Sequence, residues 1–294
     1  MTTSIRIADL TVNRLGFGAM RVLNEDVWGP PPDRPRALRV LRRAVELGVN
    51  FIDTADAYGP HTNEEVIAEA LHPYPRGLVI ATKGGLVRPD AKTWASDARP
   101  EHLKRAAEGS LKRLRLERID LYQLHSPDPK VPFEDAVGAL AELQREGKLR
   151  HVGLSNVSVE QIERARRIVP VVSVQNRYNL GERQSEDVLT HCEAQGIAFL
   201  PWFPLGAGDN LRLRKVEQIA RKRGATPAQV VLAWLLARSP AMLPIPGTGS
   251  VAHLEENCAA AAVRLAPEDL AALAWKKSGV RSALYASRVF RRFL

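Results

Sequence analysis

The sequence predicts a closed (β/α)8 TIM barrel that forms a single domain over residues 1–294. Short apolar runs alternate with amphipathic stretches along nearly the whole chain, which is typical of a parallel sheet with helical crossovers. Runs such as Val171–Val174, apolar except at Ser173, are typical of strands that are covered on both faces. Eight such strands favour a closed barrel over the alternative, a doubly wound sheet with an appended helical domain.

The expected strands are short and rich in Val, Ile and Leu: Arg14–Phe17, Asn50–Asp53, Leu78–Thr82, Asp120–His125, His151–Ser155, Val171–Gln175, Ala198–Pro201 and Met242–Ile245. Amphipathic helices are expected between them: Pro35–Leu47, Glu64–Leu71, Pro100–Leu114, Glu134–Glu146, Val159–Ile168, Glu186–Gln195, a two-helix region over Arg212–Arg238, and Pro267–Lys277. Gly196 and Gly224 follow helical stretches at the position of a left-handed cap. Residues 278–294 form a basic segment that we expect to be a tail, a docking helix or a gating element.

The charge balance favours an anionic small-molecule partner. The chain has 42 basic and 33 acidic residues, which gives a net charge of +9. Much of the excess lies on helices that should face solvent, and no aromatic residues interleave with it as nucleic-acid binding would require. No apolar stretch is long enough for a membrane span. We therefore expect a cytoplasmic protein, a monomer or weak homo-oligomer, without a nucleic-acid or membrane partner and with Cys192 and Cys258 reduced.

Polar residues end several of the expected strands, where a barrel places its catalytic groups. Asp53 ends the second strand, with Tyr58 soon after it, and Lys83 and His125 lie at the ends of the third and fourth. Each has an ordinary explanation when taken alone: a turn-forming Asp, a packed Tyr, a charged residue leaving the sheet and a core His. Their joint placement on one rim makes a catalytic set the better interpretation.

This set of residues suits the reduction of a carbonyl group by a hydride, because negative charge then develops on oxygen. A Tyr with a pKa near ~10 donates weakly at neutral pH, and a neighbouring ammonium lowers that pKa. Lys83 can supply this charge, Asp53 can hold Lys83 in place, and His125 can orient the substrate carbonyl. We therefore predict that Tyr58 is the general acid in reduction, with no metal involved.

The chain resembles the aldo-keto reductase family over roughly residues 5–276. The segment Gly48–Gly59 matches the most specific signature of that family, which ends in the catalytic Tyr, and Thr82-Lys83 and Leu124-His125 match the other members of the quartet. The resemblance implies NADPH as cofactor, with NADH as the alternative. It implies cofactor contacts from Gly18, Met20, Ser155, Asn156, Gln175, Trp202, Pro204, Leu205, Gly206, Gly247, Thr248, Ser250, His253, Glu256 and Asn257.

The roles of these residues also come from the resemblance. Ser155, Asn156 and Gln175 would hold the nicotinamide carboxamide, Trp202 would stack on the ring, and the loop from Gly206 would cover the pyrophosphate. Phe203 departs from the small residue that is more usual beside the stacking aromatic.

The phosphate loop departs from the family pattern at two positions. Gly247 stands where many members have Lys, and His253 where many have Arg, which weakens the case for NADPH over NADH. Thr248, Ser250 and the amides of a helix N-terminus would still be able to hold a phosphate. An exposed helix position is an equally good explanation for His253.

The substrate site is the least specified by sequence, because loops build it. Trp28 and Trp94 lie in loops after the first and third strands, where they would line an aromatic pocket or simply pack the loops. The segments Trp28-Gly29-Pro30-Pro31 and Ile245-Pro246-Gly247-Thr248 are similar to a bacterial subgroup that resembles pyridoxal reductases, which implies reduction of pyridoxal to pyridoxine. The alternatives are a general aldehyde reductase and a cofactor-binding regulatory protein with little turnover. A metal-dependent hydrolase is a weaker hypothesis.

Overall fold

The protein is described by a computed structural model, which covers residues 4–274. Seven strands form one parallel sheet in the order β11-β10-β9-β8-β5-β4-β3. Their bounds are β3 Phe17–Gly18, β4 Phe51–Asp53, β5 Val79–Gly84, β8 Ile119–Leu124, β9 Leu149–Ser155, β10 Val171–Arg177 and β11 Ala198–Trp202. The predicted basic segment, residues 278–294, lies outside the described residues.

The segment 242–245 closes this sheet into a barrel. On one side, the amide of Leu243 donates to the carbonyl of Phe199 at 2.8 Å, and Phe199 pairs in parallel with Met242. On the other side, the amide of Gly16 donates to the carbonyl of Pro244 at 2.9 Å. Pro244 and Pro246 have no amide hydrogen, so this eighth strand makes fewer ladder bonds than its neighbours. The predicted (β/α)8 barrel is thus confirmed.

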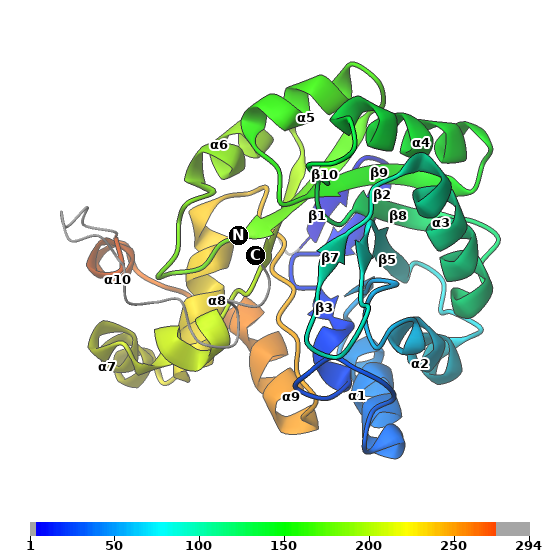
Figure 1. The fold of residues 1–294 in the computed structure, drawn as a ribbon. Helices are drawn as coiled ribbons and strands as arrows, with labels where there is room; N and C mark the ends of the chain where they lie inside the picture. Colours follow the sequence, from blue (N-terminus) through cyan, green and yellow to red (C-terminus); the bar gives the residue numbers. More distant parts are fainter. Residues whose placement is uncertain (1–3, 275–294) are drawn as a thin grey trace.

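Helices surround the barrel as an outer ring (Figure 1). They are α1 Arg34–Glu46, α2 Thr62–Leu71, α3 Pro100–Leu114, α4 Phe133–Arg145, α5 Val159–Arg166, α6 Glu186–Gln195, α7 Arg214–Arg223, α8 Pro227–Arg238, α9 Val251–Ala259 and α10 Pro267–Ala272. Short 3-10 helices add η1 Ala19–Val22, η2 Gly206–Arg212, which is kinked at Ala207 and Gly208, and η3 Ala260–Ala262. Every expected helix within the described residues is present, and α9 gives bounds to the helix that was expected to follow the phosphate loop.

Local sequence signals explain where several helices begin and end. Ser158 and Gln161 form a reciprocal capping box at the start of α5. Gly196 and Gly224 adopt left-handed backbone angles directly after α6 and α7, and their amides bond to carbonyls of the last helical turn. These two glycines therefore end their helices as predicted.

The first strand is shorter than expected. It covers only Phe17–Gly18, whereas the sequence predicted Arg14–Phe17. The Arg14 side chain is buried and donates to the carbonyls of Leu236 and Ser239, at 3.0 Å and 2.6 Å. The Arg14 side chain thus binds the C-terminal end of α8, with a longer bond of 3.4 Å to the carbonyl of Met242.

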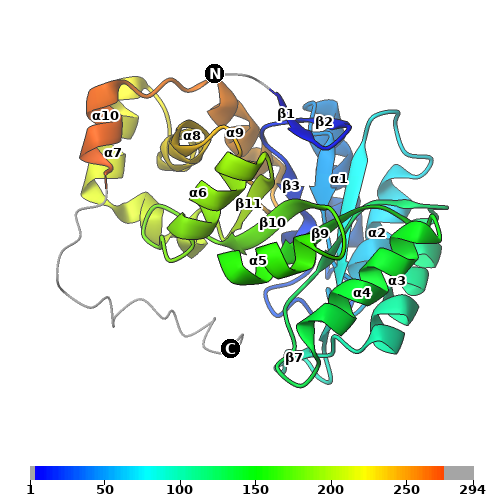
Figure 2. The ribbon, with the colours of Figure 1, turned by 90° about the horizontal axis from the view of Figure 1, so that it is seen from above.

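A hairpin of β1 Ser4–Ile7 and β2 Leu10–Asn13 covers one end of the barrel, which we call the floor. A short ribbon of β6 Leu86–Val87 and β7 Ala95–Ser96 lies at the other end, the mouth. Figure 2 shows the two pairs at opposite ends of the molecule. The sequence prediction contained neither pair.

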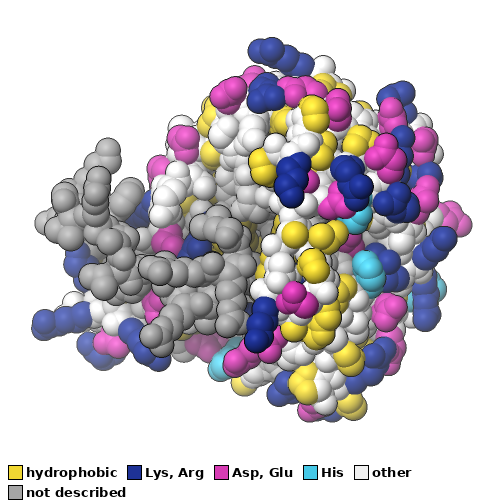
Figure 3. Space-filling model, in the orientation of Figure 1, with side chains coloured by type: hydrophobic (Ala, Val, Ile, Leu, Met, Phe, Trp, Pro, Cys, Tyr) yellow, Lys and Arg dark blue, Asp and Glu magenta, His cyan; other side chains and the backbone are white. Residues whose placement is uncertain are grey.

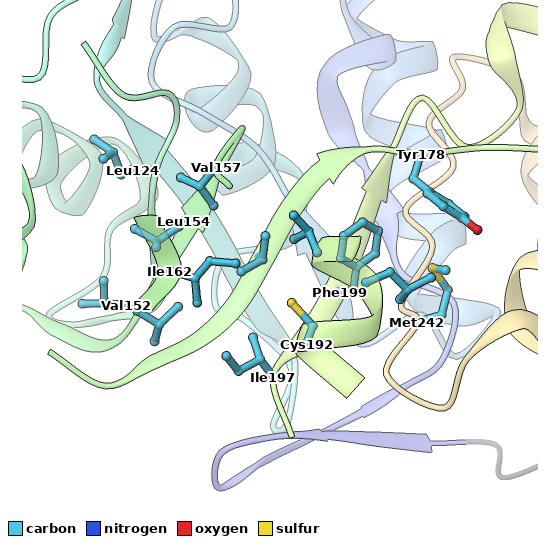
Figure 4. Close-up of a cluster of buried hydrophobic side chains, with 14 of the residues drawn as sticks. Leu124, Val152, Leu154, Val157, Ile162, Tyr178, Cys192, Ile197, Phe199 and Met242 are labelled. Carbon is cyan, nitrogen blue, oxygen red and sulfur yellow. The ribbon is translucent and has the colours of Figure 1, made fainter. Parts of the chain in front are cut away.

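The main hydrophobic core lies between the sheet and the helices that follow β8 to β11. Figure 4 shows part of it, with Leu154 and Ile162 on one side and Phe199 and Met242 on the other. Buried residues of these strands alternate between this layer and the barrel interior. Because both faces of the strands are covered, adjacent positions can both be apolar, as in Ala198–Leu200 of β11.

Acidic and basic side chains are interspersed on the face drawn in Figure 3, so the excess positive charge is not gathered there in one patch. No helix within residues 4–274 is both long and apolar enough to cross a membrane.

Candidate active site

Four predicted catalytic side chains meet at the mouth of the barrel. Asp53 ends β4, Lys83 lies near the end of β5, and His125 directly follows β8. Tyr58 comes from the loop after β4. All four are nearly inaccessible to solvent, with exposures of 3% for Asp53, 8% for Tyr58, 0% for Lys83 and 7% for His125. Parallel strands direct their carboxyl ends to one rim, which brings residues that are distant in the sequence together.

Lys83 and Asp53 form a buried ion pair. The Nζ atom of Lys83 lies 2.6 Å from Oδ1 of Asp53 and 2.7 Å from the carbonyl oxygen of Thr54. Burial lowers the pKa of Lys83, but the carboxylate of Asp53 together with Tyr58 outweighs burial and holds the pKa above its ordinary value. Lys83 is therefore an ammonium ion at neutral pH.

Tyr58 lies beside this ammonium. The Nζ atom of Lys83 is 5.2 Å from the centroid of the Tyr58 ring. Burial raises the pKa of Tyr58, and the charge of Lys83 lowers it by less, so the net pKa lies above the ordinary value. From the sequence, only the lowering effect of the ammonium on the pKa of Tyr58 was expected, and burial reverses it. In the structure Tyr58 keeps its proton at neutral pH, as a proton donor must.

His125 is a neutral imidazole at the same mouth. Burial and the neighbouring Lys83 ammonium hold the pKa of His125 well below its ordinary value. Its ring centroid is 5.8 Å from that of Tyr58, in an edge-to-face arrangement. Its Nδ1 atom is buried and has no hydrogen-bond partner among the described residues.

Two glutamine side chains complete the environment of Asp53. Its Oδ2 atom accepts hydrogen bonds from Nε2 of Gln175 at 2.9 Å and from Nε2 of Gln123 at 3.1 Å. Gln175 was predicted to contact the cofactor, whereas the sequence analysis missed Gln123. The signal for Gln123 was a polar residue within the otherwise apolar end of β8, two positions before His125.

The other residues expected around the nicotinamide lie together beside the quartet. Nδ2 of Asn156 donates to the carbonyl of His125 at 3.0 Å and to Oγ of Ser155 at 3.2 Å. The indole Nε1 of Trp202 donates to Oδ1 of Asn156 at 3.0 Å. Asn156 has a left-handed backbone with φ of 59°, which ends β9 and turns its side chain back to the mouth. The hydroxyl of Ser155 donates to the carbonyl of Gln175 at 2.7 Å.

The expected pyrophosphate loop follows β11. Pro204 is buried and Leu205 is half-buried at the start of η2. Gly206 has a φ of 61°, and a Cβ atom there would lie 2.6 Å from the side-chain Nδ2 atom of Asn210. Only a glycine fits this tight turn.

The predicted phosphate loop runs from residue 247 into α9. Gly247, Thr248 and Ser250 are half-buried, and His253 is exposed on the first turn of the helix. Oγ of Ser250 accepts the amide hydrogen of His253 at 3.4 Å, so this hydroxyl caps α9.

Four further predicted cofactor residues border these loops. Glu256 is half-buried and Asn257 is buried on α9. Gly18 lies against the carbonyl of Ile245, since a Cβ atom there would be 2.7 Å from that oxygen. Met20, in η1, packs against the small cluster that contains Tyr58.

Trp28 and Trp94 both lie close to a buried arginine, Arg88, that the sequence pattern did not single out. The Cζ atom of Arg88 is 5.4 Å from the ring centroid of Trp28 and 3.9 Å from that of Trp94. Arg88 also donates to backbone carbonyls, including those of Val27 and Ala91 at 3.0 Å and 2.6 Å. The Trp94 ring contacts Tyr58 edge to face at 6.3 Å between centroids. Trp94 is therefore held next to Tyr58, whereas Trp28 is held beside Arg88.

The arrangement can donate a proton to an oxygen atom beside a fixed positive charge. No three His, Cys, Asp or Glu side chains within residues 4–274 are grouped as metal ligands. The barrel and this mouth together define a TIM-barrel enzyme with acid–base groups at the carboxyl ends of its strands.

Comparison with known proteins identifies the family. Residues 14–277 match the model of the aldo/keto reductase family. The chain is 45% identical over 269 residues to the pyridoxine 4-dehydrogenase of Escherichia coli, covering 90% of this chain and 94% of that protein. The chain belongs to the aldo/keto reductase family, and it is an NAD(P)H-dependent oxidoreductase.

Solved structures agree with this assignment. The fold matches a glycerol dehydrogenase from Gluconobacter oxydans with a TM-score of 0.83 and 29% identity, over 92% of this chain and 94% of the other. It matches an aldo/keto reductase from Klebsiella pneumoniae, in complex with NADP and acetate, with a TM-score of 0.79 and 28% identity, over 93% and 94% of the chains.

Proposed function

We propose that this enzyme reduces an aldehyde or ketone to the alcohol with NADPH, and that Tyr58 donates the proton. The observation that carries the proposal is the buried ammonium of Lys83, held by Asp53 at 2.6 Å and placed 5.2 Å from the centroid of the Tyr58 ring. A positive charge at this point stabilises the negative charge that develops on the carbonyl oxygen and on the phenol as its proton leaves. The family and the NADP complex of the Klebsiella relative support the choice of cofactor.

The residues at the mouth fit a nicotinamide cofactor. Ser155, Asn156 and Trp202 are joined by hydrogen bonds into one polar group beside His125, which suits a carboxamide. Gln175 extends this group to Asp53. Beyond it, residues 204–206 and 247–257, together with Gly18 and Met20, would hold the pyrophosphate and adenosine. When bound, NADPH supplies the hydride to the carbonyl carbon.

In the proposed mechanism His125 orients the substrate and Tyr58 protonates it. A neutral imidazole donates one hydrogen bond to the carbonyl oxygen without adding a second charge near Lys83. As the oxygen gains negative charge, Tyr58 transfers its proton to that oxygen, and Lys83 stabilises the phenolate that is left. Asp53, with Gln123 and Gln175 on its other oxygen, keeps the Lys83 ammonium in position.

We propose pyridoxal as the substrate, with pyridoxine as the product. The 45% identity to a pyridoxine 4-dehydrogenase supports this choice. A second support is the aromatic ring of Trp94 beside Tyr58, with Trp28 near it across Arg88, since a planar heteroaromatic ring packs well against such side chains. An aliphatic aldehyde would use this surface less well.

The test is a steady-state assay of NADPH oxidation with pyridoxal and a panel of aromatic and aliphatic aldehydes, repeated with NADH. We expect the highest kcat/KM with pyridoxal and NADPH. A higher kcat/KM for another aldehyde would replace pyridoxal and leave carbonyl reduction intact. Tight NADPH binding without turnover of any carbonyl would overturn the reductase proposal and favour a cofactor-binding regulatory protein.

A further inference from the structure

A cavity lies between the phosphate loop and the elements that follow the first strand. Its volume is about 470 Å³, and its lining includes Arg21, Arg36 and the loop residues Gly247 and Thr248. Arg21 belongs to η1 and Arg36 to α1. Two positively charged side chains thus border the predicted phosphate loop, which has Gly247 in place of a lysine.

The close approach of the backbone at Gly247 to the backbone at Gly18 explains why the loop lacks that lysine. A Cβ atom on Gly247 would lie 2.4 Å from the carbonyl oxygen of Gly18, a distance at which the backbone would have to move. The same atom would be 3.7 Å from Cβ of Arg21. The Arg21 side chain therefore starts next to the point from which a side chain at residue 247 would start.

The two arginines differ from their neighbours in their partners. On α1, Arg34 pairs with Glu69, and Arg43 pairs with Glu255 at 2.8 Å. Neither Arg21 nor Arg36 has an ion pair with a carboxylate within residues 4–274. The Nη1 atom of Arg21 donates to the backbone carbonyl of Glu25 at 3.3 Å.

The charges and donors around the cavity suit a dianion. Glu25 also lines it, so two guanidinium groups face one carboxylate and a positive excess remains. Oγ1 of Thr248 accepts the amide hydrogen of Ser250 at 3.1 Å, which leaves its hydroxyl hydrogen to donate. Guanidinium groups bind phosphate oxygens through two parallel hydrogen bonds, so Arg21 is well suited to this ligand.

We propose that Arg21 binds the 2'-phosphate of NADPH, with Arg36 adding positive charge, and that Arg21 sets the preference for NADPH over NADH. The proposal rests on the function proposed above, since it requires a nicotinamide cofactor at this mouth. In this proposal Arg21 of η1 and Arg36 of α1 supply the positive charge that the phosphate loop lacks at Gly247 and His253.

The test measures the dissociation constants of NADPH and NADH by titration calorimetry for the wild type and for Arg21→Met. We expect NADPH binding to weaken about 10- to 100-fold in Arg21→Met, the range for a lost charged hydrogen bond. NADH binding should change less than about two-fold, because it lacks the phosphate that Arg21 contacts. Arg36→Met should show a smaller loss for NADPH and none for NADH.

Arg34→Met is the matched control. It removes an arginine of α1, the helix that carries Arg36, but Arg34 is paired with Glu69 and does not line the cavity. It should leave both constants unchanged. A second measurement varies the ionic strength. Raising it should weaken NADPH binding more in the wild type than in Arg21→Met.

Equal losses for NADPH and NADH, or no loss for either, would overturn the role of Arg21. If the wild type oxidises NADPH but Arg21→Met keeps its preference, only this inference fails. If the wild type binds neither cofactor, the proposed function fails instead.

Discussion

The two ends of the barrel are built from the same strands and have opposite chemistry. At the floor, Ile7 and Val12 of the β1–β2 hairpin are fully buried and pack in one apolar cluster with Phe51, Leu121 and other strand residues. At the mouth, the same strands carry the charged and polar groups of the site.

A step of two residues along a strand separates these environments. On β4, Phe51 belongs to the floor cluster and Asp53 to the mouth, and on β8 Leu121 belongs to the floor and Gln123 to the mouth. Alternate residues of a strand point to the same face, so one inward-facing row runs from an apolar start to a polar end. The floor can supply stability while the mouth carries buried charges that chemistry needs.

The largest effect should come from Tyr58→Phe at the mouth. The ring and its packing against Trp94 remain, but the proton donor is lost. We expect kcat to fall about 100- to 10,000-fold, the range for a missing general acid. Titration calorimetry should show NADPH binding close to that of the wild type. Turnover near the wild-type value would remove Tyr58 from the proposed role.

Lys83→Met should damage both stability and turnover. It leaves the Asp53 carboxylate buried without its charged partner, which lowers the free energy of unfolding by about 3–5 kcal/mol. Urea denaturation measures this loss. The double change Asp53→Asn with Lys83→Met should recover part of the stability and none of the activity. Loss of stability alone, with normal kcat, would make the pair purely structural.

Ile7→Ala at the floor should lower the stability of the fold and leave turnover unchanged. The side chain is fully buried, so the free energy of unfolding should fall by about 2–5 kcal/mol. The kcat measured well below the melting temperature should not change. Thr11→Ala, at an exposed position of the same hairpin, is the control and should leave stability unchanged. A large drop in kcat for Ile7→Ala would show that the two ends are coupled.

The mouth should also make the protein sensitive to acid. Burial and Lys83 depress the pKa of His125, so the unfolded chain takes up a proton near pH 6.5 that the folded chain refuses. Stability from this group is present above that pH and is lost as the pH falls below it, by up to about 1.4 kcal/mol per pH unit. His125→Gln should reduce the slope in urea denaturation between pH 7 and 5. An unchanged slope would assign the acid sensitivity to other groups.

The smallest effect is expected on the outer surface. Arg34 and Glu69 are paired, but their side chains are 43% and 39% exposed. Such pairs contribute less than about 1 kcal/mol, so Arg34→Ala should shift the urea midpoint only slightly. A loss as large as that of Ile7→Ala would contradict the view that the floor and the core hold the fold.

The sequence predicted the barrel well because each strand and helix has its own local pattern. The strands at 51–53, 119–124 and 171–177 lie within two residues of their predicted bounds. Arg14 was placed in a strand wrongly, because its side chain bonds to carbonyls at and just after the end of α8, more than 200 residues away. The β1–β2 hairpin had a signal in the alternation of Ser4–Ile7, but its turn at Ala8 and Asp9 carries no glycine.

The site was predictable where a chemical role selects the residue type. The predicted quartet lies together at the mouth, and Asn156 contacts Ser155 and Trp202. Gln123 and Arg88 were missed because their roles depend on three-dimensional partners, a carboxylate 70 residues away and a pair of indole rings. The cavity beside Gly247 was equally invisible, since it depends on how closely two backbone segments approach.

The hydrogen bond from Trp202 to Asn156 makes the intrinsic fluorescence of Trp202 a suitable probe of cofactor binding. The indole nitrogen donates to Oδ1 of Asn156 at 3.0 Å, the oxygen that a nicotinamide carboxamide would also approach in the proposed site. Arrival of the cofactor would exchange this partner and place a second ring beside the indole. Tryptophan emission should therefore report binding in real time, and Trp202→Phe identifies the part of the signal that comes from this residue.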